Sequence, residues 1–219
     1  MTLPSDFSKS EQEVLYRVMR ERRDMRHFIP DSSIDADVLQ RILAAAHTAP
    51  SVGLMQPWRF IQIKSLQRRE RIAALVDQER QETAKLLAER EQEFLRLKVE
   101  GIRECAALIA VVQAPDDGTV FGRRTMPAEM ALCSTASAIQ NMWLASRVEN
   151  LGMGWVSLFD PVALAKLLNC PEGAKPIALL CIGPVKEFYA KPMLEQLGWR
   201  QGKPLDEFLF EDSWPESEQ

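Results

Sequence analysis

The run Ala106–Val112, with the sequence A-A-L-I-A-V-V, constrains the fold more than any other stretch of the chain. It is apolar without interruption and has the length of a strand, which is typical of a central strand covered on both faces. Strand patterns also occur at Phe60–Lys64, Leu151–Phe159 and Ile177–Ile182. Because the helical segments outnumber the strands and do not strictly alternate with them, the sequence predicts an α+β fold with its sheet sandwiched between helices.

Helical patterns flank these strands. Ser8-Lys-Ser-Glu11 has the form of a capping box, and the helix that it starts is expected to reach Glu21–Arg23. Capping candidates within Asp31–Asp35 precede a second helix. Ala128–Asn150 is expected to form a long helix rich in small residues, and Pro161–Asn169 a short one that begins with proline. The apolar face of the first helix consists of Val14, Leu15, Val18 and Met19.

Two segments differ from this regular pattern. The charged stretch Ser65–Glu104 predicts two or three amphipathic helices lying over the core, with most of its Arg/Glu alternation on a solvated face. The tail Val185–Gln219 has no regular period, although it carries Trp199, Phe208, Phe210 and Trp214. Since an irregular tail with aromatic side chains usually packs on something, a partner subunit is the obvious candidate for its contact surface.

Composition argues against several classes of protein. A chain of 219 residues fits one domain, here 1–219, and a net charge of −4 gives no electrostatic reason to expect nucleic acid or an anionic membrane as partner. No apolar run approaches the roughly 18 residues that span a bilayer. The N-terminus lacks the basic and apolar regions of a signal peptide, so a cytoplasmic protein is expected. Four scattered cysteines without a C-x-x-C pair, and only two histidines, argue against a metal site.

The segment Ala49–Phe60, A-P-S-V-G-L-M-Q-P-W-R-F, leads from a helix into the first strand. Two prolines and Gly53 stop the helix, because proline lacks a backbone donor and glycine admits dihedral angles that other residues avoid. Such a turn leaves backbone N–H groups for a ligand, and Ser51 could add a hydroxyl group. An ordinary helix–strand turn is the alternative. His47, one turn earlier, is more typical of a satisfied core residue than of a catalyst.

Three cations surround one carboxylate in the segment R-R-D-M-R, which contains Arg22, Arg23, Asp24 and Arg26. If this segment is helical, Arg22 and Arg26 share a face while Asp24 points elsewhere. Guanidinium groups suit phosphate and the carbonyl-rich edge of a flavin. The alternative is a solvated helix end with local ion pairs.

Two later motifs could complete a binding site. Gly152-Met-Gly-Trp-Val-Ser157 lacks the spacing of a dinucleotide fingerprint and follows a helix instead of opening one. Its glycines could admit a flat ring against the backbone, with the Ser157 hydroxyl beside that ring. Leu197-Gly-Trp-Arg200 places a late cation, Arg200, where it could contact phosphate or could be an ordinary surface arginine.

These four motifs in this order resemble the nitroreductase superfamily over about residues 15–205, and within it the flavin-destructase branch. Typical flavin nitroreductases carry an asparagine that contacts the flavin where this chain has Leu54. They also carry a hydroxyl residue where this chain has Asp24. Both departures match the destructase branch and argue against a general FMN-dependent NAD(P)H nitroreductase, which is one alternative. A non-catalytic flavin-binding protein is the other.

The resemblance implies a homodimer with FMN at the subunit interface, a helical lid at about 65–104 and a C-terminal tail, about 185–219, that crosses to the partner. The fold would be a mixed sheet with helices on both faces. Reduced FMN, supplied by a separate flavin reductase, would react with O2 through a C4a-peroxyflavin. The products would be 5,6-dimethylbenzimidazole, the lower ligand of vitamin B12, and D-erythrose 4-phosphate. No metal is implied.

The resemblance also assigns roles to individual residues. Asp24 and Ser157 match the catalytic aspartate and serine of the family. Neighbouring arginines would hold Asp24 ionised, as a base, unless the lid desolvates it. Ser157 would hydrogen-bond the flavin N5 or the peroxide, and the lid would exclude water. The residues that would contact the flavin are Arg22, Arg23, Asp24, Met25, Arg26, Ser51, Leu197 and Arg200.

Overall fold

A computed structural model describes residues 6–215 of the chain. Its centre is a four-stranded sheet in the order β1-β2-β4-β3. The strands are β1 (Trp58–Gln62), β2 (Ala107–Gln113), β3 (Gly152–Val156) and β4 (Lys175–Gly183). Each neighbouring pair is antiparallel. The central position predicted for the apolar run is therefore confirmed.

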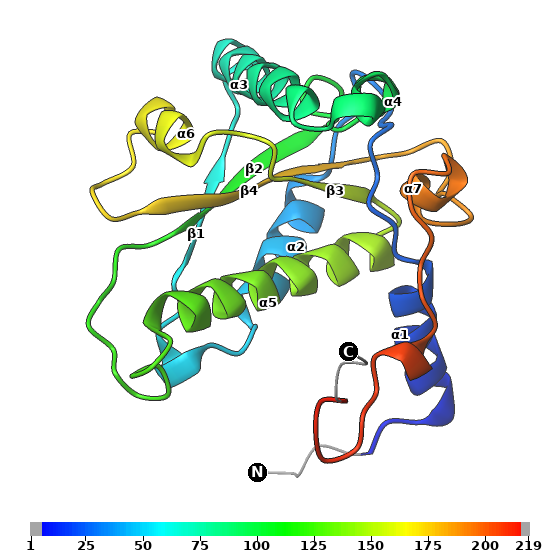
Figure 1. Cartoon of the computed structure of the whole chain (residues 1–219). Helices are drawn as coiled ribbons and strands as arrows, with labels where there is room; N and C mark the ends of the chain where they lie inside the picture. The colour runs from blue at the N-terminus through cyan, green and yellow to red at the C-terminus, as the bar shows by residue number, and fades with distance from the viewer. Residues whose placement is uncertain (1–5, 216–219) are drawn as a thin grey trace.

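Helices cover both faces of this sheet, as Figure 1 shows. On one face lie α2 (Ala36–His47) and α5 (Pro127–Val148), and on the other lie α3 (Leu66–Lys85) and α6 (Pro161–Leu167). The side chains of β2 alternate between the two layers. Ile109 and Val111 pack with residues of α2 and α5, whereas Leu108 and Ala110 pack with residues of α3 and α6. Because both faces of β2 are buried, its sequence is apolar throughout.

The first helix, α1 (Lys9–Glu21), begins at the predicted capping box. The Ser8 side chain accepts a hydrogen bond from the Glu11 N–H, and the Glu11 carboxylate accepts one from the Ser8 N–H at 2.8 Å. The helix ends at Glu21, and its cap residue Arg22 already has an extended backbone. The condition under which Arg22 and Arg26 would share a helix face is therefore not met, because the segment after Glu21 is extended.

Strand boundaries differ from the prediction by one to three residues, as β1 and β3 show. β1 begins at Trp58 instead of Phe60, because Trp58 already pairs with Gln113 of β2. β3 ends at Val156, whereas the sequence predicted a strand to Phe159. The Phe159 N–H bonds the Ser157 carbonyl, so the chain turns there towards Asp160, the N-cap of α6. Ser157 consequently lies just beyond the end of an edge strand.

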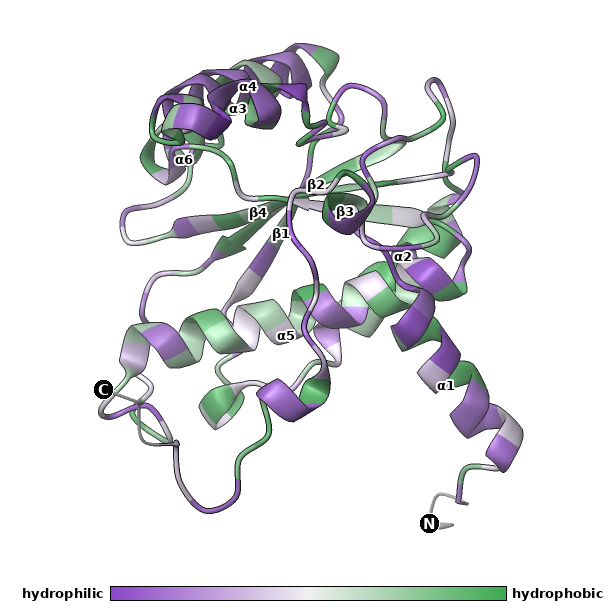
Figure 2. Ribbon diagram, turned by 45° about the vertical axis from the view of Figure 1, so that its right-hand side comes forward, coloured by the Kyte–Doolittle hydropathy of each residue, from purple (hydrophilic) through white to green (hydrophobic). Residues whose placement is uncertain are grey.

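The charged excursion forms helices, as predicted. It contains α3, a short 3-10 turn (Ala88–Arg90) and α4 (Glu91–Arg96). Figure 2 shows hydrophilic and hydrophobic residues alternating along α3, which lies over the sheet. Its buried residues include Ile72 and Val76, so α3 has the apolar face of an amphipathic helix.

The tail after β4 contains the short helix α7 (Met193–Gln196) and a 3-10 turn at Leu205–Glu207. Phe208 and Trp214 are exposed. So are Val14 and Leu15 on α1, although the sequence placed them on one apolar face with the buried Val18. The start of the N-terminus (1–5) and the end of the expected tail (216–219) lie outside the described residues. Within 6–215, no helix is long and apolar enough to cross a membrane.

Candidate functional site

Three segments that are distant in sequence enclose a cavity of about 230 Å³. Asp24 and Arg26 form one wall together with the end of β3 and the residues after it. The charged excursion forms a second wall, and the tail forms a third. The lining residues are Asp24, Arg26, Trp155, Val156, Ser157, Leu158, Phe94, Leu97, Lys98, Val99, Met193, Leu194 and Trp199. Asp24 and Ser157, predicted as the catalytic pair, thus line the same cavity.

Backbone pairing with β3 fixes the position of Asp24. The extended segment after α1 runs parallel to β3 and forms an isolated bridge between Asp24 and Met153. The Met25 N–H donates to the Met153 carbonyl at 2.9 Å. The Trp155 N–H donates to Asp24 Oδ1 at 3.0 Å, so the carboxylate is bound directly to the edge strand. This bridge is the parallel element added to an otherwise antiparallel sheet.

Arg26 holds the Asp24 carboxylate in a fixed orientation. Its Nη1 donates to Asp24 Oδ1 at 2.8 Å and its Nη2 to Oδ2 at 2.6 Å. The same Nη2 donates to the Trp155 carbonyl at 2.8 Å. Arg26 is buried, whereas the Asp24 side chain keeps 44% of its surface accessible. Because Asp24 lines the cavity, its carboxylate is available to a ligand there.

The glycines of β3 have a different role from the predicted one. A Cβ atom on Gly154 would overlap the Met25 carbonyl oxygen and lie 2.5 Å from Arg26 Nη1. A Cβ atom on Gly152 would lie 2.5 Å from Val185 Cγ1. The space above these glycines is therefore filled by the protein itself, and the prediction that they admit a flat ring is wrong. They allow the segment that carries Asp24 to lie directly on the strand.

Burial raises the pKa of Asp24 above its ordinary value, although Arg26, the Trp155 N–H and Arg22 act in the opposite direction. The sequence predicted an ionised carboxylate unless the lid desolvates it, and desolvation is the larger effect here. The Asp24 side chain nevertheless keeps 44% of its surface accessible and lines the cavity. A carboxyl group with this balance is suited to taking up and releasing a proton.

Arg22 and Arg23 lie on the other side of Asp24. They line a second cavity of about 160 Å³ with Asp24 and the tail segment Pro192–Leu194. The Arg22 guanidinium lies 4.5 Å from the ring centre of Trp143, and burial lowers its pKa. Arg23 donates to the carbonyls of Arg20 and Arg22 and, at 3.0 Å, to that of Ala190 in the tail. Arg23 therefore connects the end of α1 to the tail.

The remaining predicted flavin contacts do not line the 230 Å³ cavity. The Met25 side chain is fully buried in the core. Leu197 and Arg200 are exposed on the tail, on either side of the Trp199 that does line it. The Ser51 hydroxyl accepts a hydrogen bond from the Gln56 N–H at 3.1 Å.

Two contacts along α5 show how far the Ser51 turn lies from Asp24. The Val52 N–H donates to Ser134 Oγ at 3.2 Å. Trp143 Nε1 donates to the Arg23 carbonyl at 3.2 Å. Ser134 and Trp143 are separated by about 14 Å along the helix axis, at 1.5 Å per residue. One chain therefore does not bring the Ser51 turn to the cavity beside Asp24.

Trp58 and His47, which flank this turn in the sequence, form a hydrogen-bonded pair. Trp58 is buried, as expected of an anchor, and its Nε1 donates to His47 Nδ1 at 3.2 Å. His47 is therefore satisfied, as predicted, although it is exposed and not part of the core. Within residues 6–215 there is no group of three or more His, Cys, Asp or Glu side chains that could hold a metal ion.

Sequence reasoning missed several cavity residues. Phe94, Leu97 and Lys98 line the cavity from the charged excursion, and the Lys98 Nζ pairs with the Glu104 carboxylate. The charge pattern of this stretch predicted amphipathic helices but could not show what their apolar residues cover. Trp199 lies inside the L-G-W-R motif, between the two residues of that motif that were predicted as contacts.

The cavity has the chemical character of a site for a flat, partly charged ligand. Its walls combine apolar and aromatic side chains with one carboxylate and the cations Arg26 and Lys98. Such a combination fits an isoalloxazine ring, which has apolar faces and a polar edge. The volume of 230 Å³ is below the roughly 300–1,000 Å³ that is usual for small-molecule sites. These residues fit a flavin, although the volume is small for a complete ligand site.

The sheet order, the helical layers and the covered cavity together define a nitroreductase-like α+β fold. The sequence profile of the Nitroreductase family matches residues 19–184. The chain therefore belongs to the nitroreductase family.

Curated relatives match over most of the chain. A protein of Rhodospirillum rubrum named 5,6-dimethylbenzimidazole synthase is 39% identical over 204 residues, which cover 90% of this chain and 94% of the relative. A protein of Rhodobacter capsulatus with the same name is 38% identical over 204 residues, which cover 92% and 98% of the two chains.

Solved structures share the fold. A BluB-like flavoprotein from Clostridium difficile 630 has a TM-score of 0.68 at 18% identity, with 90% of this chain and 97% of the other covered. Oxidised iodotyrosine deiodinase bound to FMN and 3-iodo-L-tyrosine has a TM-score of 0.70 at 17% identity, with 91% and 100% covered. At these identities the likeness concerns the fold alone.

Proposed function

We propose that this chain is a 5,6-dimethylbenzimidazole synthase, an oxidoreductase that fragments reduced FMN with O2 into 5,6-dimethylbenzimidazole and D-erythrose 4-phosphate. The observation that carries the proposal is that Asp24 and Ser157 line one covered cavity. It is supported by curated relatives of that name at 35–39% identity over most of the chain. Reduced FMN would supply both the electrons and the carbon skeleton of the product.

Asp24 would move protons at its carboxylate oxygens. Arg26 and the Trp155 N–H fix the orientation of the carboxylate, and burial raises its pKa, which favours its taking up a proton. Ser157 would orient the reacting group through its hydroxyl. Phe94 and Leu97 would exclude water, which would otherwise divert the reaction with oxygen.

Arginines near Asp24 would bind the anionic and carbonyl-rich parts of FMN. Arg22 and Arg23 lie at the second cavity, directly behind Asp24. Arg200 follows Trp199 on the tail and is exposed, so it is free to reach a phosphate. Met25 and Leu197 would support the site without lining the cavity. The Met25 side chain anchors the Asp24 segment in the core, and Leu197 is the C-cap residue of α7.

A homodimer would complete the site. The cavity of one chain is smaller than a usual ligand site, and the Ser51 turn lies far from Asp24 along α5. A second copy would place its Ser51 turn against the flavin bound beside Asp24. The exposed Phe208 and Trp214 of the tail would then pack on the partner. A separate flavin reductase in the cytoplasm would supply the reduced FMN.

The turn at residue 54 favours this activity over that of a general NAD(P)H nitroreductase. Leu54 is 78% exposed and has no amide group to offer to a flavin. A non-catalytic flavin-binding protein would not require a carboxylate held by an arginine at the cavity wall. The position of Asp24 is thus better explained by a catalytic function than by flavin storage.

One product assay tests the proposal. Photoreduced FMN is mixed anaerobically with the protein, oxygen is admitted, and the products are identified by chromatography. We expect 5,6-dimethylbenzimidazole without any nicotinamide. Asp24→Asn should lower its yield about 100-fold or more, since a proton-transfer group is lost, while FMN affinity stays within about threefold.

Each other outcome contradicts a defined part of the proposal. Reduced FMN that is only reoxidised by the wild-type protein would favour a nitroreductase or a flavin-binding protein. An unchanged yield in Asp24→Asn would remove Asp24 from the chemistry. A collapse of FMN affinity in the same variant would make Asp24 a residue that organises the site.

A further inference from the structure

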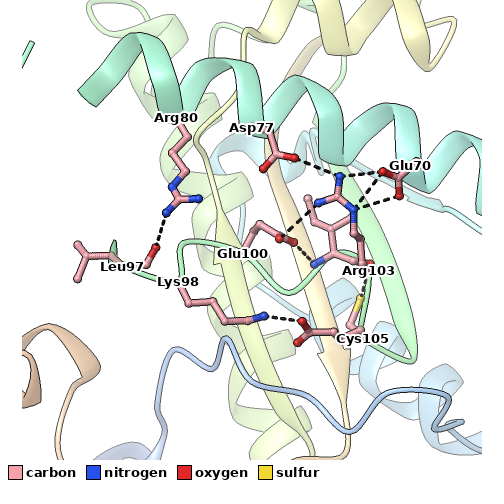
Figure 3. A network of polar contacts seen from close by, with 10 residues as sticks. Glu70, Asp77, Arg80, Leu97, Lys98, Glu100, Arg103 and Cys105 are labelled. Atoms are coloured by element: carbon pink, nitrogen blue, oxygen red, sulfur yellow. Dashed lines mark hydrogen bonds and ion pairs between the residues drawn. The ribbon is translucent and has the colours of Figure 1, made fainter. Parts of the chain in front are cut away.

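Within the charged excursion, α3 is bonded to the residues at the end of α4 and to the segment that leads into β2. Arg103, which precedes β2, bonds Glu70 at 2.8 Å and Asp77 at 3.1 Å, both on α3 (Figure 3). Arg80 of α3 donates to the Leu95 and Leu97 carbonyls, at the end of α4. These contacts hold α3 and the residues that follow α4 in place on one side of the cavity.

The other end of the excursion touches the tail at Trp199. The Arg90 guanidinium carbon lies 3.6 Å from the Trp199 ring centre, and Arg90 Nη2 donates to the Trp199 carbonyl at 3.1 Å. Glu93 accepts from Arg90 Nε and Nη2 at 2.9 and 3.0 Å. The guanidinium plane is thereby held over the indole, the geometry in which a cation is attracted to an aromatic face.

Trp199 also contacts the lining of the cavity. Its ring lies 6.1 Å from that of Phe94, centre to centre, and both side chains line the cavity with Leu158. The Arg90–Trp199 contact is therefore the outer part of a cluster whose inner part is the cavity wall. The Arg90 side chain is 46% exposed, so this contact lies at the solvent-exposed rim of the cavity.

We propose that Arg90 and Trp199 form a latch that keeps residues 66–97, the part of the charged excursion that we call the lid from here on, closed over the Asp24–Ser157 cavity, and that Arg90 is a positioning residue for the reaction. The inference rests on the proposed function. Because the contact is exposed at the rim, it can open to admit FMN and close before oxygen reacts. Contacts along α3 would act as the fixed end of the same lid.

An open latch would have a defined chemical consequence. Reduced FMN that is reached by water returns to oxidised FMN and gives its two electrons and two protons to O2, which becomes hydrogen peroxide. A closed latch would keep water away and favour fragmentation. The ratio of hydrogen peroxide to 5,6-dimethylbenzimidazole therefore reports closure when folded protein is in excess over FMN, because unbound reduced FMN also gives hydrogen peroxide.

The first test requires no flavin. Hydrogen exchange of backbone amides is measured on the full chain for wild type, Arg90→Gln and Trp199→Leu. Arg96→Gln is the matched control, because Arg96 is an exposed cation on α4 that does not line the cavity. We expect exchange over 88–97 to rise roughly threefold or more in the first two variants. It should stay unchanged over 66–80 and in Arg96→Gln. Equal exchange over 88–97 in all four proteins would overturn the latch.

The second test uses the single-turnover assay. Arg90→Gln and Trp199→Leu should raise the ratio of peroxide to product by about threefold or more, Arg90→Lys should restore part of the difference, and Arg96→Gln should match wild type. A ratio that is unchanged in both variants would contradict the latch. If wild type makes no 5,6-dimethylbenzimidazole, the proposed function fails, and the exchange data still decide whether the latch exists.

Discussion

Arg26 binds both carboxylate oxygens of Asp24, at 2.8 and 2.6 Å, and binds the Trp155 carbonyl with the same guanidinium group. The pair therefore joins the segment after α1 to the edge strand β3 at the wall of the cavity. Arg26 is buried, whereas Asp24 keeps accessible surface on the cavity side. The arginine thus has a supporting role, and the carboxylate is the member of the pair that a ligand can reach.

Stability should depend on pH through Asp24. Its folded-state pKa is raised, chiefly by burial, above the unfolded-state value of about 3.9. A group of this kind contributes stability below the unfolded pKa and loses it as the pH rises through the folded pKa. The free energy of unfolding of Asp24→Asn, minus that of wild type, should therefore increase from pH 4 to pH 7. Urea denaturation at both pH values measures it, and a difference that stays constant or falls would show that the pKa is not raised.

Removing Arg26 should leave Asp24 in its place without its main partner. Arg26→Gln is expected to lower the free energy of unfolding at pH 7 by about 1–3 kcal/mol, because hydrogen bonds to a partly buried charge are lost. Arg41→Gln is the control, since Arg41 pairs with Glu149 on the surface and its loss should cost less than about 1 kcal/mol. Equal effects of the two substitutions in urea denaturation would contradict a structural role of the Asp24–Arg26 pair.

Gly154→Ala should displace the segment that carries Asp24. The added methyl group overlaps the Met25 carbonyl, which is backbone and cannot turn away. We expect a loss of about 1–3 kcal/mol in unfolding free energy, as for other overpacked sites, together with weaker FMN binding in a fluorescence titration. Gly118→Ala is the control, because it introduces backbone strain without steric overlap. Gly118 has a φ of +76° but nothing within 4 Å of its Cβ position. The Gly118→Ala control should be destabilised but should bind FMN with normal affinity. Normal FMN affinity in Gly154→Ala would contradict the packing argument.

Local sequence patterns predicted the layers of this fold but not the details of its site. The apolar run of β2 and the capping box at Ser8 depend on neighbours along the chain, and both are confirmed. The Asp24 site depends on pairing between residues 131 positions apart, such as Trp155 with Asp24. No periodicity reveals such a contact. For that reason the segment after Glu21 was considered as a helix, and the β3 glycines were assigned to a ligand instead of to Met25 and Val185.

The burial that raises the pKa of Asp24 has the same long-range origin. Counting charges in R-R-D-M-R predicts an ionised carboxylate, because three cations surround one acid. The structure places Arg23 on main-chain carbonyls and Arg22 over Trp143, so only Arg26 contacts the acid directly. Sequence can count neighbouring charges but cannot show which way they point or how deeply the carboxylate is buried.

The Ser51 turn carries backbone strain that a single substitution should relieve. Leu54 has a φ of 55°, in the left-handed region, and its side chain is 78% exposed. That conformation costs most residues roughly 1–2 kcal/mol, and asparagine adopts it more readily. Leu54→Asn should therefore raise the free energy of unfolding by about 0.5–1 kcal/mol, since little apolar surface is lost. Leu86→Asn is the control, because Leu86 is equally exposed but has an ordinary helical φ of −79°. Urea denaturation should show a gain for Leu54→Asn only, and a gain in both variants, or in neither, would mean that strain at residue 54 is not the cause.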